Sequence, residues 1–194
     1  MSKIDFDAMI VDLRELCRTM ETAHDFFHAL RVTQMAERIG QNLAEPIDAD
    51  KLKLLALLHD ADDPKNFPVF EDHAATIMQK NGVDPALSKE VTEEISLISF
   101  SKGKTPRSLE GKIVQDADRM DAIGAVGIAR TFCYGGKHDV PIYDEDGYCT
   151  IRHFYDKLLK LKDLMNFEYS TKLAAERTEV MERFLKDFFG EING

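Results

Sequence analysis

Residues 54–63 read Leu54-Leu55-Ala56-Leu57-Leu58-His59-Asp60-Ala61-Asp62-Asp63, an apolar run that ends in a histidine and acidic residues. A helix that is apolar on most of its faces is buried, so the run predicts a core helix that begins at Asp50. An ionised Asp60 beside the His59 imidazole at the end of such a helix costs free energy unless a partner compensates the charge. A divalent metal is such a partner, and imidazole with carboxylate suits Mn, Fe, Zn, Co or Ni better than Mg.

A second histidine, on another predicted helix, offers a further ligand. This helix would begin with Thr22 as its N-cap and end at Gly40. It carries His28, with His24 one turn earlier and Arg31 about one turn later on roughly the same face. A lone histidine on an amphipathic helix is more often a core or surface residue than a ligand. His28 therefore gains weight only in combination with the histidine and aspartate of the core helix.

Aspartates in a third predicted helix complete the pattern. After an N-cap at Ser108, this apolar helical run contains the stretch Gln115-Asp116-Ala117-Asp118-Arg119-Met120-Asp121. Asp118 and Asp121 are three residues apart and share a face, whereas Asp116 projects elsewhere. Two imidazoles and two carboxylates on three helices are rarely brought together without a metal. The four candidate ligands are His28, His59, Asp60 and Asp118.

Helical periodicity runs through most of the chain, which predicts an all-α fold. Further helices are expected over residues 9–20, about 70–80, 85–99, 128–134, 151–165 and 170–189. The clear interruption spans residues 135–150, where we expect one long loop or a minimal hairpin of residues 140–143 with 148–149. We expect a single domain over residues 1–194, with its core at about 20–134 and C-terminal helices 151–189 packed on it.

The composition argues against several classes of partner. The 194 residues are 44% hydrophobic, enough for one sizeable domain. With 25 Lys and Arg against 35 Asp and Glu, the net charge of −10 disfavours nucleic-acid polymers and anionic membranes, although a bound metal can still make one pocket attractive to phosphate. No stretch approaches the roughly 18 apolar residues of a membrane span. The cysteines, Cys17, Cys133 and Cys149, are expected to be reduced thiols, which predicts a cytoplasmic protein.

The order His28, His59-Asp60, Asp118 resembles the H…HD…D signature of the HD superfamily of metal-dependent phosphohydrolases. Residues 24–32, 54–63, 115–124, 128–132 and 153–159 look like the YedJ/YpgQ-type branch of that superfamily. The resemblance implies an all-helical HD-domain bundle. It also implies a divalent metal ion (Mn, Mg, Fe, Co, Ni or Zn) on those same four residues, with Asp116 as the alternative to Asp118.

The resemblance also implies roles for residues around the metal. Asp63 falls four residues after His59, where related enzymes place a carboxylate that works on the attacking water, so Asp63 is expected to act in catalysis with the ligands His59 and Asp60. The preferred phosphate contacts follow from placement in the sequence: Arg31 lies one turn from His28, and Lys65 lies two residues beyond Asp63. His24 and Asp25 are expected to support the metal shell or to contact the substrate. Other cations remain alternatives for the phosphate, namely Lys102, Lys104, Arg107 and Arg119.

The activity implied by this branch is that of a nucleoside triphosphate pyrophosphohydrolase that releases pyrophosphate. A nucleoside monophosphate phosphatase or another phosphodiesterase is the alternative within the superfamily. An HD-fold di-iron oxygenase would need more histidines for a second metal, and only His73 lies at a suggestive distance after His59. A non-catalytic nucleotide-binding module would typically have lost the ligands. The expected partner is thus a small phosphorylated molecule, a nucleotide, with no nucleic-acid polymer and no membrane; a homodimer stays open.

Overall fold

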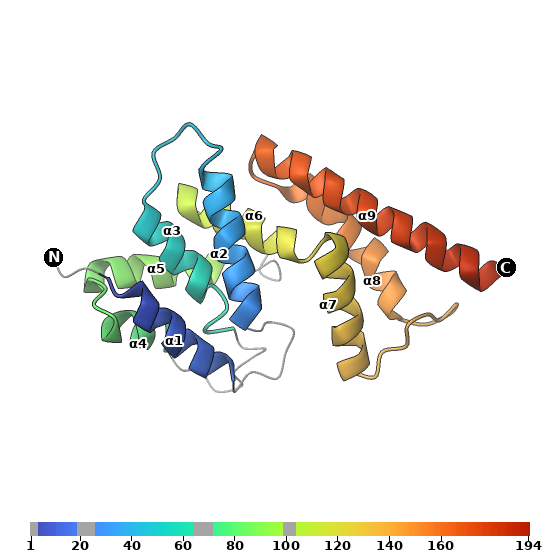
Figure 1. The fold of residues 1–194 in the computed structure, drawn as a ribbon, viewed down its shortest axis with the longest axis horizontal. Helices are drawn as coiled ribbons and strands as arrows, with labels where there is room; N and C mark the ends of the chain where they lie inside the picture. Colours follow the sequence, from blue (N-terminus) through green and yellow to red (C-terminus); the bar gives the residue numbers. More distant parts are fainter. Residues whose placement is uncertain (1–3, 19–25, 64–71, 99–103) are drawn as a thin grey trace. The chain divides into compact units, whose positions relative to one another are not determined.

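The computed structural model describes residues 4–18, 26–63, 72–98 and 104–194 (Figure 1). These parts of the chain are helices joined by turns and loops, which confirms the predicted all-α fold. They divide into two compact units, Met1–Ala117 and Asp118–Gly194. The single-domain organisation expected from the sequence stays a prediction, and each unit is described by itself below.

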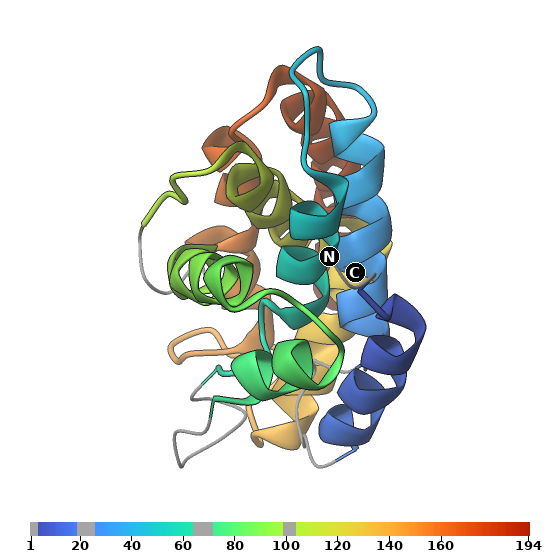
Figure 2. The ribbon, with the colours of Figure 1, turned by 90° about the vertical axis from the view of Figure 1, so that its left-hand side faces the viewer.

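The first unit holds the helices that carry the histidines. It contains α1 (Phe6–Cys17), α2 (Phe26–Gly40), α3 (Ala49–Leu58), α4 (His73–Lys80), α5 (Pro85–Ile98) and most of α6 (Leu109–Asp121). Helix α3 packs against α2 and α5, while α4 packs against α1 and α5, as Figure 2 shows for the blue, teal and green segments. The expected N-cap Thr22 lies outside the described residues. The expected helix ends at residue 20, at about residue 70 and at residue 99 also lie outside the described residues, and the remaining boundaries in this unit differ from the expected ones by a few residues at most.

Helix α3 is the buried core helix that the apolar run predicts. Its N-cap is Asp48, whose carboxylate accepts a hydrogen bond from the Lys51 N–H at 3.0 Å, so the helix begins at Ala49, one residue before the expected start. Every leucine from position 54 to 58 is at most 1% exposed. Close packing around these side chains holds α3 in place, and thereby the direction in which the residues after Leu58 leave it.

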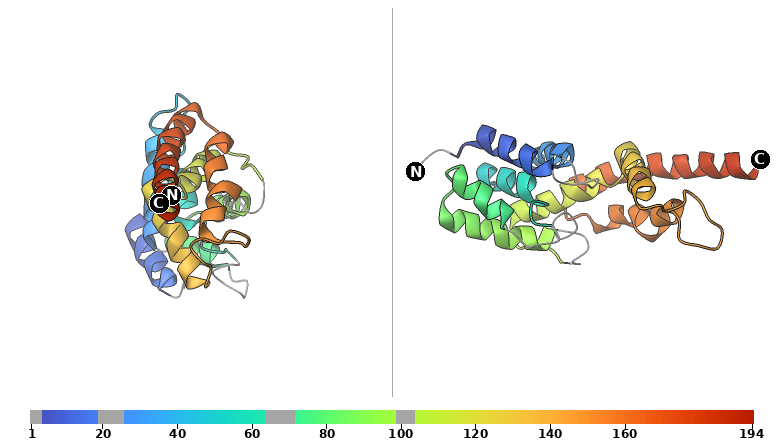
Figure 3. Two further views of the ribbon diagram at one scale, coloured as in Figure 1. Left: turned by 90° about the vertical axis from the view of Figure 1, so that its right-hand side faces the viewer. Right: turned by 90° about the horizontal axis from the view of Figure 1, so that it is seen from below.

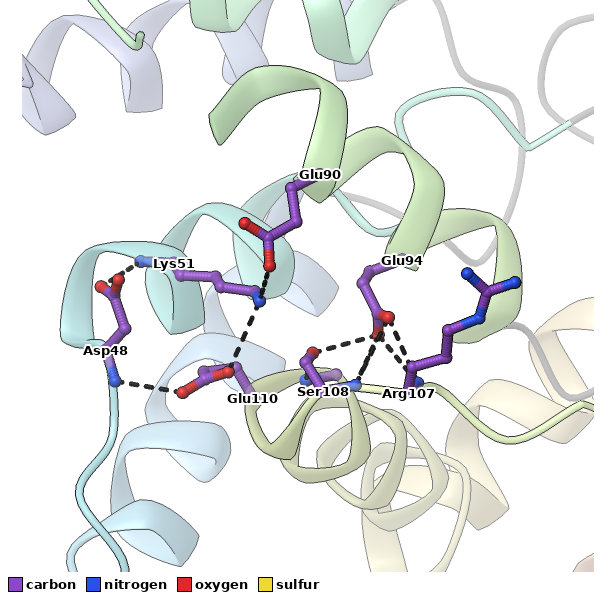
Figure 4. Close-up of polar contacts among 8 residues, drawn as sticks. Asp48, Lys51, Glu90, Glu94, Arg107, Ser108 and Glu110 are labelled. Carbon is purple, nitrogen blue, oxygen red and sulfur yellow. Dashed lines mark hydrogen bonds and ion pairs between the residues drawn. The ribbon is translucent and has the colours of Figure 1, made fainter. Parts of the chain in front are cut away.

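A polar network holds the start of α3 against α5 and α6 (Figure 4). The Lys51 ammonium bonds to Glu90 of α5 and lies 3.8 Å from Glu110 of α6, whose other carboxylate oxygen accepts the Asp48 N–H at 3.1 Å. Burial alone would lower the pKa of Lys51, but the hydrogen bond to Glu90 and the neighbouring carboxylates outweigh it, and the pKa is raised. Lys51 is therefore a permanent cation that joins three helices.

Glu94 of α5 holds the start of α6 in the same view (Figure 4). Its buried carboxylate accepts hydrogen bonds from the backbone N–H groups of Arg107 and Ser108, at 3.2 and 3.3 Å, and from the Ser108 hydroxyl at 3.0 Å. The Ser108 oxygen in turn accepts the Gly111 N–H at 3.0 Å, which confirms Ser108 as the N-cap of α6. A carboxylate at a helix N-terminus also interacts favourably with the helix dipole.

The side chain of Gln115 joins two other parts of the first unit. This residue of α6 is 1% exposed, and its amide donates to the Ile98 carbonyl at 3.2 Å and to the Lys104 carbonyl at 2.9 Å. The end of α5 and the chain at Lys104 are therefore both held by one buried amide of α6.

The second unit contains the end of α6 with α7 (Gly124–Lys137), α8 (Thr150–Asp156), the 3₁₀-helix η2 (Leu158–Leu164) and α9 (Glu168–Asn193). Helix α9, red in Figure 3, packs against α7 and η2. The expected helix over 151–165 is wrong as one element, because the backbone at Lys157 (φ −133°, ψ −59°) leaves the helical region and separates α8 from η2. The expected helix over 128–134 is longer at both ends.

Residues 138–149 form a loop, and the alternative of a hairpin is wrong, since all of residues 135–150 are described and none is in a strand. Gly135 and Gly136 belong to the last turn of α7, and Thr150 already starts α8. Two backbone hydrogen bonds tie the loop together, from the Thr150 N–H to the Pro141 carbonyl at 2.9 Å and from the Ile151 N–H to the Ile142 carbonyl at 3.1 Å. Gly135 lies so close to the Thr150 hydroxyl that a Cβ there would clash with it.

Candidate metal centre

Three ligand atoms from two helices meet in the first unit. His28 lies in α2, His59 is the C-cap of α3, and Asp60 is in the turn that follows. The Nε2 atoms of the two histidines are 3.1 Å apart. Oδ2 of Asp60 lies 3.3 Å from Nε2 of His28 and 3.4 Å from Nε2 of His59. The adjacent residues His59 and Asp60 can point to one place because α3 ends just before them, at Leu58. These are three of the four ligands expected from the sequence, and they group together within the described residues.

The orientation of the His59 ring is fixed by the backbone of its own helix. Nδ1 of His59 lies 2.9 Å from the carbonyl oxygen of Ala56. Because a carbonyl oxygen only accepts, this hydrogen bond assigns the proton to Nδ1 and leaves the lone pair of Nε2 directed at His28 and Asp60. Ala56 is among the last residues of α3, whose carbonyls have no partner further along the helix, so the bond also satisfies a helix end.

The triangle of ligand atoms has the dimensions of a metal site. A metal with bonds of about 2.1 Å holds neighbouring ligand atoms about 3.0 Å apart in octahedral and about 3.4 Å apart in tetrahedral geometry. The three separations, 3.1, 3.3 and 3.4 Å, fall in this range. Nε2 of His59 and the Asp60 carboxylate are both acceptors, and both face Nε2 of His28, so they repel one another unless a cation or a proton lies between them. The residues present therefore fit a divalent ion.

The site is closed on the side of the histidines and open on that of the aspartate. The side chain of His28 is 1% exposed, whereas that of Asp60 is 16% exposed. A water molecule or a substrate would therefore approach such an ion from the Asp60 side.

Asp62, for which the sequence predicts no role, connects the turn after Asp60 to α4. Oδ1 of Asp62 accepts a hydrogen bond from the Ala74 N–H, in the first turn of α4, at 3.2 Å. Burial raises the pKa of Asp62, although hydrogen bonds from the backbone of His73 and Ala74 oppose this rise. The bond spans twelve residues of sequence, so no local pattern announces it. It holds the chain just beyond the candidate ligands His59 and Asp60.

Asp63, the expected catalytic carboxylate, ends this turn. Its backbone N–H donates to the Asp60 carbonyl at 3.2 Å, and its side chain is partly exposed. Arg31, one of the expected phosphate contacts, is half-buried on α2, three residues after His28. The roles of both residues stay predictions.

The remaining expected site residues are placed in three ways. His24, Asp25, Lys65 and Lys102 lie outside the described residues. Asp116, the alternative ligand, is fully buried at the end of the first unit, whereas Asp118 opens the second unit and is partly exposed. Because the two units are described separately, Asp118 as the fourth ligand stays a prediction. Lys104 and Arg107 are exposed, and a guanidinium nitrogen of Arg119 donates to the Leu164 carbonyl.

A second metal centre in the first unit would need additional ligands near these three. His73 is the first residue of α4, and it is not part of the group that His28, His59 and Asp60 form within the described residues. The remaining described histidines, His138 and His153, belong to the second unit.

In the described parts of the chain, no helix is both long enough and apolar enough to cross a membrane.

Comparison with known protein families and sequences gives one family match and two related proteins. The family model described as HD domain matches residues 25–123. The protein YpgQ of Bacillus subtilis is 37% identical over 182 residues, which covers 89% of this chain and 86% of that protein. The protein L803 of Acanthamoeba polyphaga mimivirus is 32% identical over 109 residues, or 48% of this chain and 45% of that protein.

Solved structures show the same similarity over nearly the whole length. The crystal structure of B. subtilis YpgQ in complex with ADP superimposes with a TM-score of 0.83 at 32% identity, covering 98% of this chain and 99% of the other. An HD-superfamily hydrolase from Bacillus thuringiensis gives a TM-score of 0.76 at 34% identity, with 97% and 96% coverage. The similarity therefore includes the segments on both sides of the residues that the family model matches.

Proposed function

Because this chain belongs to the HD-domain family, we propose that it is a divalent-metal-dependent phosphohydrolase that acts on nucleotides. The observation that carries the proposal is the convergence of His28, His59 and Asp60 within hydrogen-bond distance of one another at the open end of a buried helix. Such a donor set suits a divalent ion, and the family resemblance extends to the motifs that carry all four ligands. Asp118 is the proposed fourth ligand, on the ground of the sequence motif Ala117-Asp118-Arg119.

Two relatives support the class of reaction and the class of substrate. The B. thuringiensis protein is described as an HD-superfamily hydrolase, which favours hydrolysis over oxygenation for this chain. The B. subtilis relative binds ADP in its crystal structure, which favours a nucleotide as ligand. The finer proposal is a nucleoside triphosphate pyrophosphohydrolase that releases pyrophosphate from a cytoplasmic nucleotide.

The proposed chemistry assigns a task to each residue around the centre. When bound, a divalent ion lowers the pKa of a coordinated water and polarises a phosphoryl oxygen. Asp63 would orient the attacking water and accept its proton. Arg31 and Lys65 neutralise the remaining phosphate oxygens, and His24 with Asp25 supports the metal shell or the substrate. His28 and His59 exclude water from the buried side, so that the reacting group enters at Asp60.

The reaction type is tested by a panel of nucleoside tri-, di- and monophosphates assayed with Mn²⁺, Mg²⁺, Co²⁺, Ni²⁺ and Zn²⁺. Pyrophosphate and orthophosphate are measured separately. Release of pyrophosphate from triphosphates supports the proposal in full. Orthophosphate from monophosphates would replace it with the phosphatase alternative, and binding of nucleotides without turnover under any metal would contradict an enzymatic role.

The metal requirement needs its own measurement in the same assay. Elemental analysis of the purified protein gives the number and identity of the ions per chain. One divalent ion per chain fits the ligand group described above. Two irons per chain together with oxygen consumption would instead support an oxygenase, and the hydrolase proposal would then be wrong.

A further inference from the structure

The C-terminal end of α6 in the second unit is held by arginines from several elements. Helices end with carbonyl groups that have no partner in the helix, and cationic side chains satisfy them while interacting with the negative end of the helix dipole. Three guanidinium groups form hydrogen bonds at this end of α6: two donate to residues of the helix end, and one belongs to the helix end itself and donates to η2. They belong to Arg119 of α6, Arg130 of α7 and Arg177 of α9.

Arg130 makes the most extensive of these contacts. Its Nη1 donates to Oδ2 of Asp121 at 2.6 Å and to the backbone carbonyl of the same residue at 3.2 Å. The Asp121 side chain is 5% exposed and that of Arg130 is 17% exposed, so the pair is largely shielded from water. A charge-assisted bond in such surroundings is stronger than one on the surface. It fixes both the side chain and the main chain of the last residue of α6.

Arg177 and Arg119 hold the neighbouring residues. A guanidinium nitrogen of Arg177 donates to the Met120 carbonyl, and the side-chain carbons of Arg177 pack against Gly124. Arg119 donates to the Leu164 carbonyl at the end of η2. In the turn after α6, the Ala122 N–H donates a hydrogen bond to the Arg119 carbonyl at 3.2 Å.

We propose that Arg130 is a positioning residue for the metal centre: through Asp121 it fixes the last turn of α6, and with it the direction of Asp118, one turn earlier on the same helix face. The inference rests on the proposed function, because Asp118 matters here as the fourth ligand. Residues three apart on a helix lie on the same face, so a rotation of Asp121 would carry Asp118 with it. Groups that orient metal ligands strongly influence affinity.

The test compares metal binding by the full-length protein and its variants. Arg130→Gln removes the charge and the paired bonds, Arg130→Lys keeps the charge with one flexible donor, and Arg152→Gln is the matched control. Arg152 forms an exposed ion pair with Asp156 at 3.6 Å in the same unit. Calorimetric titration with Mn²⁺ and the absorption spectrum of bound Co²⁺ are the readouts, with thermal unfolding measured alongside.

We expect Arg130→Gln to weaken Mn²⁺ binding about 10-fold, a change of the size that supporting groups around a metal produce, and Arg130→Lys to restore part of it. Arg152→Gln should bind Mn²⁺ like the unmodified protein. If Arg130→Gln lowers the melting temperature but leaves Mn²⁺ affinity and the Co²⁺ spectrum unchanged, its role is structural only and the inference is overturned. Should Arg130→Gln fail to fold, Asp121→Asn removes the same ion pair from its other end. Its Mn²⁺ affinity, Co²⁺ spectrum and melting temperature are then judged by the same criteria.

A double-mutant cycle separates this inference from the ligand assignment on which it rests. Asp118→Asn alone should weaken Mn²⁺ binding, and Asp118→Asn with Arg130→Gln should weaken it no further, because Arg130 acts through Asp118. If the two losses simply add, Arg130 acts by another route and only the inference fails. If Asp118→Asn binds Mn²⁺ normally, the fourth-ligand assignment fails and the inference falls with it.

Discussion

Nε2 of His28 faces Nε2 of His59 at a distance of 3.1 Å, although the two residues are 31 positions apart in the sequence. With the His59 proton held on Nδ1 by the Ala56 carbonyl, the facing nitrogen of His59 can only accept. The carboxylate of Asp60 adds a second acceptor that lies near both histidine nitrogens. The arrangement therefore gains most from a cation at its centre.

Removal of either residue at the end of α3 should destroy this centre. In His59→Ala and Asp60→Ala we expect loss of stoichiometric metal binding together with loss of hydrolysis, since each change removes one of three converging ligand atoms. Elemental analysis and the nucleotide assay measure the two effects. His138→Ala, an exposed position in the second unit, is the control and should keep both. Normal hydrolysis by either ligand variant would mean that the reaction takes place elsewhere.

Chelation should destabilise the folded chain reversibly. A metal that binds only the native state stabilises it by about 2.7 kcal/mol at a free concentration 100-fold above its Kd. Treatment with a chelator is therefore expected to lower the melting temperature, and titration back with the preferred ion to restore it. The His59→Ala variant should show no such response to metal. A melting temperature of the unmodified protein that ignores both chelator and metal would contradict a resident ion.

Replacement of Glu94 tests the anchor at the start of α6. In Glu94→Gln one oxygen becomes an amide that cannot accept from the Arg107 and Ser108 N–H groups, and the charge is lost. We expect the free energy of unfolding to fall by about 1–3 kcal/mol, the cost of unsatisfied buried donors. Denaturant unfolding measures it. Glu93→Gln, next to it but exposed, should change stability by at most about 0.5 kcal/mol. Equal effects at the two positions would contradict the anchoring role.

Two glycines of α7 should respond in opposite directions to the same substitution. Gly124 has φ +76° with Arg177 packed against it, so Gly124→Ala is expected to cost about 1–2 kcal/mol of unfolding free energy. Gly136 is helical with open space around it, and Gly136→Ala should stabilise by about 0.5–1 kcal/mol. Thermal or denaturant unfolding of both variants decides the matter. A stabilised Gly124→Ala would show that α7 can start without the left-handed residue.

The pH dependence of stability should contain a contribution from His153. Burial lowers the pKa of His153, and the charge of Lys157 lowers it further. The folded chain therefore favours the neutral ring, so this stability is present above the unfolded pKa of about 6.5 and is lost as the pH falls through the folded value. The melting temperature should drop less between pH 7.5 and about 5.5 in His153→Gln than in the unmodified protein. Parallel curves for the two proteins would contradict this assignment.

Much of the fold follows from local signals, and the elements that do not are explained by distant contacts. The apolar run of α3 and the N-cap at Ser108 are local patterns, and both predictions are confirmed. The break at Lys157 was not predicted, because the residues around it keep helical periodicity. Likewise, two glycines in a row indicate a loop, yet Gly135 remains helical where its lack of a side chain lets Thr150 approach.

The candidate site divides in the same way. The order of histidines and aspartates in the sequence indicates which residues could serve as ligands, and the structure brings three of the four together. The residues that support them, such as Asp62 with its bond to Ala74, lie far from their partners in sequence, so spacing carries no signal for them. The Asp121–Arg130 pair is another case, because its two members belong to different helices.

The bond from His59 to the Ala56 carbonyl has a consequence for how this site can change over generations. Its acceptor is a main-chain atom, which every amino acid supplies, so position 56 can mutate to any residue that fits the core without altering the protonation of the histidine. A carboxylate in that role would have to be inherited together with its histidine. The lone pair that His59 directs at His28 and Asp60 therefore does not depend on which side chain occupies position 56.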